Sequence, residues 1–282
     1  MSKLKGLLLT EGLHGMISQV EGLAKALDLD YFHEKVELNS FWKLIPPRFT
    51  PIKKFVFKNN INKDFNIIIS CGRKSVVPSI FLKKINSKIK NIHIQDPKVN
   101  FKNFDYIISP EHDNLKGDNI ISSKGAIHYL TSEEIDEKKN YLLERISKEK
   151  KIITLILGGP TKYYAYSNQN LLNIFSKISK QVLNNNFQVI VIPSNRTPSR
   201  TIDLAKKFFS KEHLIIDKVD KNAYLSSLGI ADYIIVTCDS SSMISEAALT
   251  GKPLYVAMIP PLKKDTRFQK FRKLFESMNI LR

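Results

Sequence analysis

The stretch CDSSSMISEAALTGKPLYVA, from Cys238 to Ala257, carries the pattern that decides the fold. It follows an apolar strand expected over Tyr233–Val236 and opens with a polar, serine-rich turn. A helix is expected over Ser242–Leu249, and a second apolar strand over Leu254–Ala257. Backbone N–H groups and hydroxyls at the start of such a helix stabilise anions such as phosphate. The stretch therefore predicts a strand–turn–helix–strand unit with an anion-binding turn.

Glu246 adds a sugar-binding element to the same stretch. It lies seven residues beyond Asp239, about two helical turns, and could face the same side of the helix. A carboxylate in that place can accept hydrogen bonds from the hydroxyls of a sugar. The residues of this stretch that we expect to bind a phosphate or a sugar are Asp239, Ser240, Ser241, Ser242 and Glu246.

Strands and helices alternate along the rest of the chain. Apolar runs predict strands over Leu4–Leu9, Asn66–Ser70, Asn91–Ile94, Tyr106–Ile108, Ile120–Ser122, Ile152–Leu157, Phe187–Ile192 and His213–Ile216. Helices are expected over Ile17–Leu27, Val76–Ile85, Ser132–Lys148, Gln169–Asn184, Thr197–Phe209, Lys221–Gly229 and Arg267–Met278. This alternation is typical of parallel sheets covered by helices, an α/β fold.

The pattern restarts near residue 150, after a charged, linker-like helix. We therefore expect two Rossmann-like domains facing a cleft, with boundaries at 1–148 and 149–262. A final segment, 263–282, is expected to be a helix that could cross back to the N-terminal domain. Ligands of such sheets bind beyond the carboxyl ends of the strands.

Composition is that of a soluble globular protein. Of 282 residues 43% are hydrophobic, mean hydropathy is −0.19, and no apolar run approaches the roughly 20 residues that span a bilayer. The N-terminus shows no secretory signal. Cys71 and Cys238 are too few for a disulfide framework, which indicates two buried thiols in a reducing cytoplasm.

The net charge of +17 is distributed unevenly. Twelve basic residues and one acid, Asp64, lie between Lys43 and Lys90. Within that window, FWKLIPPRFTPIKKFVFK (Phe41–Lys58) interleaves apolar and cationic residues without helical regularity. Such a segment suits the anionic surface of a membrane, and the other interpretation is an ordinary solvated basic face. We expect no nucleic-acid partner, because no nucleic-acid module signature is present.

Three loops of the first domain are candidates for chemistry. In TEGLHGMISQ, Gly12 and Gly15 allow close approach of a ligand, and Gln19 could reach into the site. His14 in the same loop could act as a general base, or could simply be exposed. In SCGRKS, Arg73 is expected to bind phosphate or carboxylate, or to form a surface ion pair.

Two carboxylates follow successive strands of the first domain. Asp96 lies in IQDPKVN and Asp113 in SPEHD, where each could serve as a general base or bind acceptor hydroxyls. His112 beside Asp113 suggests a metal, but no second cluster with ligand spacing supports one. We expect no metal and no cofactor.

Two further loops of the second domain are candidate phosphate sites. LGGPTKYYAYS places Gly158, Gly159 and Thr161 after a buried strand, although the Gly-Lys-Ser/Thr ending of a P-loop is missing. IPSNRTPSR gathers hydroxyls and guanidiniums at a helix start, and the phosphate-binding residues expected there are Ser194, Arg196 and Thr197. Turn formation and helix capping are the alternative roles of both loops.

Taken in order, GLHGMISQ, CGRKS, QDPKV, SPEHD, LGGPTKYY, SNRTPSR and DSSSMISEAALTGKPLY resemble the Elm-type mitochondrial-fission-protein-like family. Its bacterial members are described as candidate glycosyltransferases. More distantly, the layout is similar to two-domain, GT-B-fold glycosyltransferases such as the one that makes lipid II. That resemblance implies that Gly12–Gly15 face the acceptor and diphosphate, that Gly158–Gly159 contact the diphosphate, and that Glu246 binds the ribose. Met16 stands where the family often carries a histidine.

The hypothesis that follows is a cytoplasmic, metal-independent glycosyltransferase that could lie peripherally on the inner face of a membrane. Its partners would be a nucleotide-diphosphate sugar and a saccharide or lipid-linked acceptor of the cell envelope, as in lipopolysaccharide biosynthesis. Two alternatives stay open. One is another nucleotide-sugar enzyme such as an epimerase, although the G-x-x-G-x-x-G and Tyr-x-x-x-Lys patterns of NAD-dependent epimerases are missing. The other is a non-catalytic membrane-surface scaffold.

Overall fold

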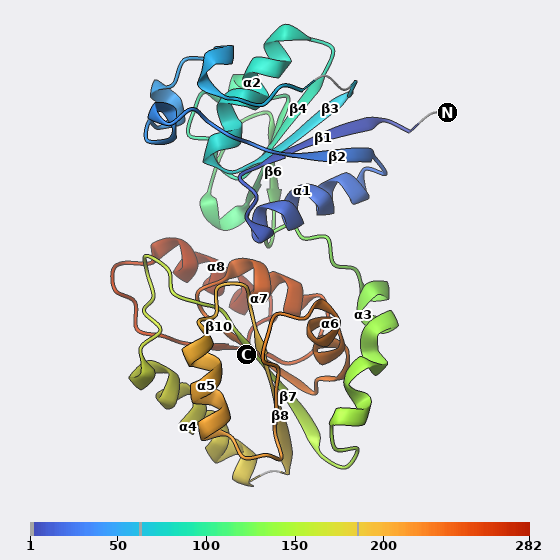
Figure 1. Cartoon of the computed structure of the whole chain (residues 1–282), viewed down its shortest axis with the longest axis vertical. Helices are drawn as coiled ribbons and strands as arrows, with labels where there is room; N and C mark the ends of the chain where they lie inside the picture. Colours follow the sequence, from blue (N-terminus) through green and yellow to red (C-terminus); the bar gives the residue numbers. More distant parts are fainter. Residues whose placement is uncertain (1–2, 62–63, 185) are drawn as a thin grey trace. The chain divides into compact units, whose positions relative to one another are not determined.

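The structure is a computed structural model that describes residues 3–61, 64–184 and 186–282. The chain divides into two compact units, Met1–Tyr129 and Leu130–Arg282 (Figure 1). Each unit has one parallel sheet flanked by helices, which confirms the predicted α/β fold with two parallel-sheet domains.

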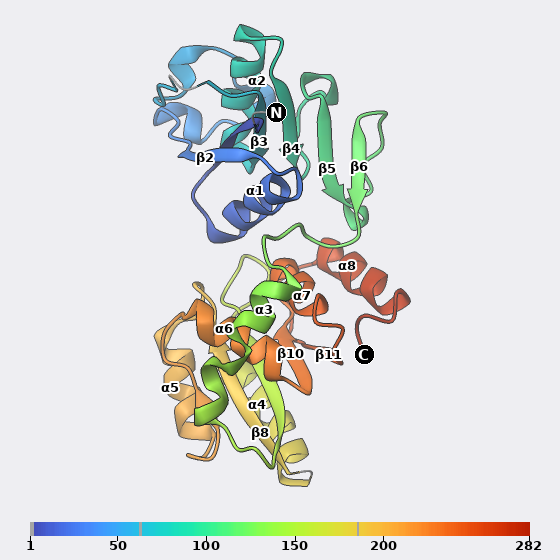
Figure 2. The same ribbon diagram turned by 90° about the vertical axis from the view of Figure 1, so that its right-hand side faces the viewer.

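The first unit holds a six-stranded sheet in the order β2-β1-β3-β4-β5-β6, in which all paired strands are parallel (Figure 2). Its strands are β1 (Lys5–Thr10), β2 (Asp30–Lys35), β3 (Ile67–Cys71), β4 (Lys90–Ile94), β5 (Tyr106–Pro110) and β6 (Ile120–Ser123). Its α-helices are α1 (His14–Ala26) and α2 (Val76–Ile85). Single 3-10 turns cover Phe41–Lys43, Pro47–Phe49, Lys54–Val56, Arg73–Ser75, Phe101–Asn103 and Glu111–Asp113.

Apolar residues on both faces of β1 explain why this strand lies inside the sheet. Leu8 packs with Val20 of α1, whereas Leu7 and Leu9 pack on the opposite face with Val77 of α2. Successive side chains of a strand point to opposite faces, so a strand covered on both faces needs a continuous apolar run. Burial of such side chains contributes about 25 cal/mol per Å² of apolar surface.

The second unit holds a five-stranded parallel sheet in the order β11-β10-β7-β8-β9. Its strands are β7 (Lys151–Leu157), β8 (Phe187–Pro193), β9 (Leu214–Ile215), β10 (Tyr233–Thr237) and β11 (Leu254–Ala257). Its helices are α3 (Ser132–Lys138), α4 (Asn168–Asn184), α5 (Ser199–Phe208), α6 (Lys221–Ile230), α7 (Ser241–Ala248) and α8 (Thr266–Ser277), with a 3-10 helix over Lys139–Arg145.

The division between the units falls 19 residues before the predicted boundary at 148/149. The charged helix that we placed at the end of the first domain packs against α6 of the second unit instead. The Ser226 hydroxyl donates to the Lys139 carbonyl (2.8 Å) and accepts from the Leu142 N–H (3.1 Å), and Tyr141 donates to Asp220 (3.0 Å). These hydrogen bonds attach the segment to α6, which sequence charge alone did not reveal.

Helix α8 belongs to the second unit, where a buried ion pair attaches it to the loop after β7. The Asp265 carboxylate, 1% exposed, accepts from the Arg272 guanidinium (3.1 Å) and from the Tyr164 hydroxyl. Arg272 also lies 3.3 Å from the Tyr164 hydroxyl. Phe268 packs edge-on against the same tyrosine ring. These contacts attach α8, part of the segment 263–282 that we expected could cross back, to the second unit.

Both cysteines are buried and unpaired with each other. Among the helices of the described residues, none is both long and apolar enough to cross a bilayer.

Candidate functional site

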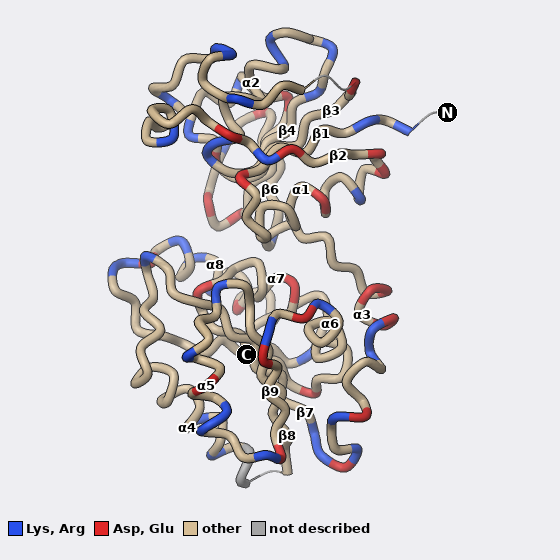
Figure 3. The backbone as a smooth tube through the Cα atoms, in the orientation of Figure 1, with Lys and Arg blue, Asp and Glu red and all other residues tan. Residues whose placement is uncertain are grey.

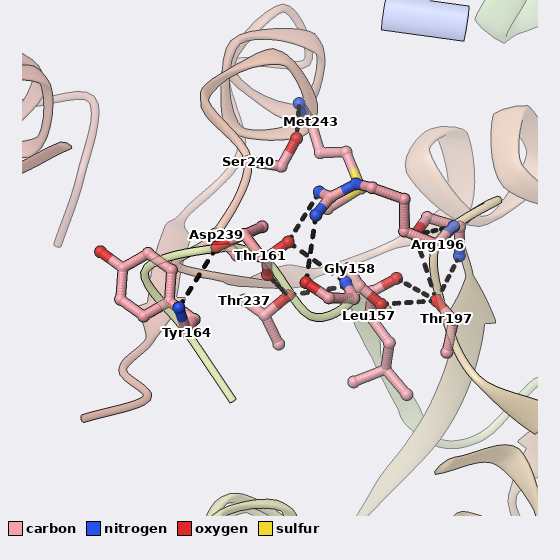
Figure 4. A network of polar contacts seen from close by, with 12 residues as sticks. Leu157, Gly158, Thr161, Tyr164, Arg196, Thr197, Thr237, Asp239, Ser240 and Met243 are labelled. Atoms are coloured by element: carbon pink, nitrogen blue, oxygen red, sulfur yellow. Dashed lines mark hydrogen bonds and ion pairs between the residues drawn. The ribbon is translucent and has the colours of Figure 1, made fainter. Parts of the chain in front are cut away.

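The second sheet places two of the predicted loops side by side. Strand β7 pairs directly with β10, although β8 and β9 come between them in the chain. From β7 the chain continues to β8, toward one edge of the sheet, whereas from β10 it continues to β11, toward the other edge. The strand order therefore reverses between β7 and β10, and ligands of such sheets bind at this switch point. Gly158 follows β7 and Asp239 follows β10 there, as Figure 4 shows.

Asp239 is the centre of a buried hydrogen-bond network at this edge. Its side chain is fully buried. The Gly159 N–H donates to Oδ2 (3.2 Å), and the hydroxyls of Tyr166 (2.5 Å) and Thr237 (2.7 Å) donate to Oδ1. Protein donors engage both carboxylate oxygens, and the predicted contact of Asp239 with a ligand stays a prediction. The carboxylate orders the loops around it.

The fourth partner of Asp239 is Arg196, from the loop between β8 and α5. Its guanidinium contacts Asp239 Oδ2 (2.7 Å) and the Gly159 carbonyl (3.0 Å), and 40% of the side chain remains exposed (Figure 4). A planar guanidinium held at two points keeps its remaining donors in a fixed orientation. Arg196 therefore has a fixed orientation and a partly exposed side chain at the carboxyl edge of the sheet.

Neither glycine after β7 has room for a side chain. A Cβ on Gly158 would lie 2.1 Å from Asp239 Oδ2, and one on Gly159 would lie 2.0 Å from the Arg196 carbonyl oxygen. Only glycine lets the backbone come this close to the neighbouring loops. The glycine pair is thus required by the packing of the three loops.

Helix α7 begins directly after Asp239. The Ser240 hydroxyl caps it by accepting the N–H of Met243 (3.4 Å). Ser241 and Ser242 occupy its first turn, half-buried, where helical N–H groups lack intrahelical partners. N–H groups at a helix start stabilise anions, so the predicted phosphate contact at this end of α7 stays a prediction.

Glu246 lies on α7, and its carboxylate contacts α6. The carboxylate is 7% exposed and accepts one hydrogen bond, from the Tyr224 hydroxyl (2.7 Å). Burial raises the pKa of Glu246 to about 7, and the hydrogen bond from Tyr224 opposes the shift. A buried carboxyl whose pKa is raised in this way is common at functional sites. Tyr224 was missed by the sequence analysis because nothing in a helical tyrosine marks its partner.

Three hydroxyls that we predicted to bind a ligand form hydrogen bonds within their own loops. Thr161 accepts the N–H groups of Tyr163 (3.1 Å) and Tyr164 (3.2 Å). Thr197 accepts the N–H of Ser194 (2.8 Å) and lies within hydrogen-bond distance of two carbonyls after β7. The Ser194 hydroxyl contacts Thr197 (3.1 Å). These residues shape the two turns, which is the alternative role that the sequence left open.

The first glycine loop of the first unit is shorter than predicted. Helix α1 already begins at His14, so Gly15 lies within it, and only Gly12 keeps a left-handed φ of 83°. His14 is exposed at the helix start, with its ring edge-on to Tyr129 at 6.3 Å. The predicted glycine-rich ligand loop therefore reduces to the turn around Gly12.

The side chain of Gln19, on α1, is buried against the ends of two strands of the first sheet. It is 5% exposed, donates to the Gly15 carbonyl (2.9 Å) and accepts from Gln95 (3.2 Å). Its amide spans the ends of β3 and β4, as the 4.0 Å contact with Cys71 shows. The prediction that Gln19 contacts a ligand does not match this buried position.

The guanidinium of Arg73, predicted to bind phosphate or carboxylate or to form a surface ion pair, contacts a backbone carbonyl. It donates to the Lys43 carbonyl (2.5 Å) and fastens the 41–43 turn to the loop after β3. One carboxylate at this edge of the sheet is Glu11, which accepts the Lys74 N–H (3.1 Å) and pairs with its ammonium (2.9 Å). Glu11 was not among the predicted residues, since a single acid after a strand carries little information.

Asp96 and Asp113 follow the neighbouring strands β4 and β5, as predicted. Asp96 accepts the Lys98 N–H (2.9 Å) and contacts its ammonium, with 19% of the side chain exposed. Asp113 is 11% exposed and lies 3.6 Å from the His112 ring. Asp96 is the more accessible of the two carboxylates.

Metal ligation has no support within residues 3–61, 64–184 and 186–282. In those ranges no three His, Cys, Asp or Glu side chains come together as a metal would require. The one histidine deep in the first sheet is His93, whose pKa burial lowers to about 3 while Asp96 opposes the shift. It contacts the Ser70 hydroxyl (2.8 Å) and is a core residue.

An apolar cavity of about 890 Å³ opens elsewhere in the second unit, between α4 and the sheet. Its walls include Ile174, Ile235, Tyr255 and Val256, with Lys177 at one side. It lacks the convergent polar groups of the Asp239 network, so the candidate site is at the switch point and not in this cavity.

The two parallel sheets define an α/β fold of the GT-B type, and solved structures with that fold are similar to this chain. A UDP-GlcNAc 2-epimerase from Methanocaldococcus jannaschii is 13% identical, with a TM-score of 0.54 over 97% of this chain and 92% of that chain. The catalytic domain of starch synthase IV from Arabidopsis thaliana, bound to ADP and acarbose, is 10% identical, with a TM-score of 0.53 over 90% and 83%.

The chain belongs to the Mitochondrial fission ELM1 family, whose model matches residues 14–282. Uncharacterized protein RP120 of Rickettsia prowazekii is 29% identical over 88% of this chain and 81% of its own length. Mitochondrial fission protein ELM1 of Arabidopsis thaliana is 25% identical over 72% of this chain. The alignment covers 54% of that relative, so the chain corresponds to about half of it.

Proposed function

We propose that the protein is a glycosyltransferase that moves a sugar from a nucleotide-sugar donor to a saccharide or lipid-linked acceptor of the cell envelope, without a metal. The observation that carries the proposal is the contact of Arg196 with Asp239 just before α7, the helix that also carries the buried Glu246 with its Tyr224 partner. A positioned cation and free N–H groups suit a diphosphate. A carboxylate with a tyrosine partner suits ribose or sugar hydroxyls.

In the proposed reaction a base takes the proton of an acceptor hydroxyl, whose oxygen attacks the anomeric carbon of the donor. The bond from that carbon to the diphosphate oxygen breaks, and the diphosphate leaves with the electron pair. Arg196 and the N–H groups of α7 stabilise the negative charge that develops on the leaving group. Asp96 is the candidate base, and Asp113 and His14 are the alternatives.

Calorimetric titration tests the donor site. UDP, GDP and their sugar derivatives are titrated into the wild-type protein, with and without EDTA. At least one nucleoside diphosphate should bind, equally well with the chelator. Glu246→Gln and Tyr224→Phe should each weaken it by about tenfold, the effect of one hydrogen bond to a charged group. Glu276→Gln, at an exposed carboxylate of α8, is the matched control.

The pH dependence of binding supplies a second readout. Hydroxyls that donate to Glu246 favour its ionised form, so the affinity for a nucleotide sugar should rise as pH passes through the pKa of about 7. Glu246→Gln should remove that dependence. If no nucleotide binds the wild-type protein at any pH, the proposal is wrong.

An epimerase is the second candidate, favoured by the similarity of the fold to a UDP-GlcNAc 2-epimerase. It needs no acceptor. Incubation with the bound nucleotide sugar alone distinguishes the two reactions, because only an epimerase converts the donor into its epimer. A non-catalytic scaffold of the same fold predicts neither product nor nucleotide binding.

A further inference from the structure

The segment between β2 and β3, residues 41–58, forms a fixed surface on the first unit, here called the 41–58 surface. Thr50, Val56 and Phe57 point inward and are buried. Phe57 pairs with Leu38 in an isolated β-bridge, and the amide of Asn39 donates to the Phe55 carbonyl (2.5 Å). The bond from Arg73 to the Lys43 carbonyl holds the other end. The segment is therefore anchored, and its outward side chains are presented by an ordered backbone.

The outward side chains include four large apolar residues. Phe41 is 65% exposed, Leu44 81%, Phe49 63% and Phe55 58%. Trp42 packs between two of them, with ring centroids 4.9 Å from Phe41 and 5.9 Å from Phe55. Single exposed apolar residues are ordinary, but four on one short anchored segment mark an interaction surface.

Cations alternate with these apolar groups, and the segment holds no acid. Five exposed basic residues lie on it, and Figure 3 shows the blue Lys and Arg positions of this loop on the outside of the first unit. In the described part of the chain, none of the five has an ion-pair partner. They are Lys43, Arg48, Lys53, Lys54 and Lys58.

We propose that the 41–58 surface binds the headgroup region of an anionic lipid bilayer. Aromatic and leucine side chains partition into the interface between headgroups and acyl chains, and adjacent Lys and Arg bind the negative surface charge. A nucleic acid or an acidic protein would use the cations but would leave Leu44 and Phe49 in water. The inference rests on contacts within the first unit and does not depend on the proposed function.

Vesicle co-sedimentation without any nucleotide tests the proposal. The full chain is mixed with phosphatidylcholine vesicles, or with vesicles containing roughly a third of phosphatidylglycerol. Wild type should bind the anionic vesicles only. Lys43→Gln with Lys53→Gln should reduce binding about 30-fold at low salt, at the usual contribution of each cation near such a surface. Leu44→Ser with Phe49→Ser should reduce it by on the order of tenfold, most clearly at high salt.

The matched control changes the same residue types on another surface of the first unit. Ile85, 68% exposed at the end of α2, lies between Lys84 and Lys88, and Ile85→Ser with Lys84→Gln and Lys88→Gln should leave binding unchanged. Circular dichroism confirms that each variant is folded. The proposal is overturned if wild type ignores anionic vesicles, if the control loses as much binding as the two test variants, or if an oligonucleotide binds through these residues while vesicles do not.

Discussion

Glu246→Gln should make the second unit more stable at pH 8 than the wild type, and the structure sets the size of the effect. The carboxyl is almost fully enclosed, with the Tyr224 hydroxyl as its hydrogen-bond partner. Burial disfavours the charged form, so the folded protein holds the proton up to a pKa of about 7. A glutamine keeps the shape and can still accept the hydroxyl.

The expected magnitude follows from the difference between two pKa values. The unfolded chain loses this proton at 4.5 and the folded chain at about 7, a difference of 2.5 units, or about 3 kcal/mol at 1.36 kcal/mol each. Below pH 4.5 both states hold the proton, and the full stability is present. As pH rises from 4.5 to 7 the unfolded state ionises first and stability falls. Above pH 7 the loss is complete and stays constant. Glutamine does not titrate, so the variant avoids this loss.

Urea unfolding at pH 5 and pH 8 measures the effect. Trp42 is the single tryptophan and lies in the first unit, so its fluorescence follows that unit while circular dichroism follows both. From pH 5 to pH 8, the free energy of unfolding of the second unit should rise in the variant relative to the wild type. The urea transition of the first unit, followed by Trp42 fluorescence, should be the same in both proteins. Glu276→Gln should show no such gain. Equal effects of Glu246→Gln at both pH values would refute a buried carboxyl that ionises near neutrality.

Three further predictions concern the residues that hold the site loops. Gly158→Ala should destabilise the second unit by about 3 kcal/mol or more in urea unfolding, because the new methyl group overlaps the Asp239 carboxylate. Gly251→Ala is the comparison: Gly251 has a φ of 65° but open space around it, so the same assay should show a cost of about 1 kcal/mol. Asp265→Ala should cost about 3–5 kcal/mol, measured by urea unfolding, since it leaves the Arg272 guanidinium buried without its carboxylate. EDTA should leave the thermal midpoint unchanged, measured by calorimetry, if the site works without a metal.

The regular elements of both units could be predicted from the sequence, because their strands are buried on two faces. Helix α2 and strand β11 were predicted to the residue. Strand β2 was missed because its sequence, DYFHEK, mixes charges with aromatics. It lies at the edge of the sheet, where one side has no neighbouring strand, and pairing with β1 is what makes it a strand. Such pairing depends on contacts that local patterns do not encode.

The positions of the site loops were also predictable, but not the direction in which each side chain points. Asp239 was expected to contact a ligand, and protein donors engage both of its carboxylate oxygens. Gln19 was expected to reach into the site and is buried on α1 beside the ends of β3 and β4. Tyr224, from a helix with no motif, supplies the partner of Glu246. A motif indicates that a polar group lies at the end of a strand, whereas its partners come from segments 20 to 80 residues away in the chain.

The closeness of Gly158 and Gly159 to their neighbours has a thermodynamic consequence. Asp239 accepts the N–H of Gly159, and Arg196 donates to its carbonyl. Since Arg196 and Asp239 also pair with each other, the loops after β7, β8 and β10 are linked into one ordered unit. If the proposed ligand binds there, its contacts are already ordered, and binding loses little conformational entropy of the protein. The entropy of ordering these loops was lost when the second unit folded.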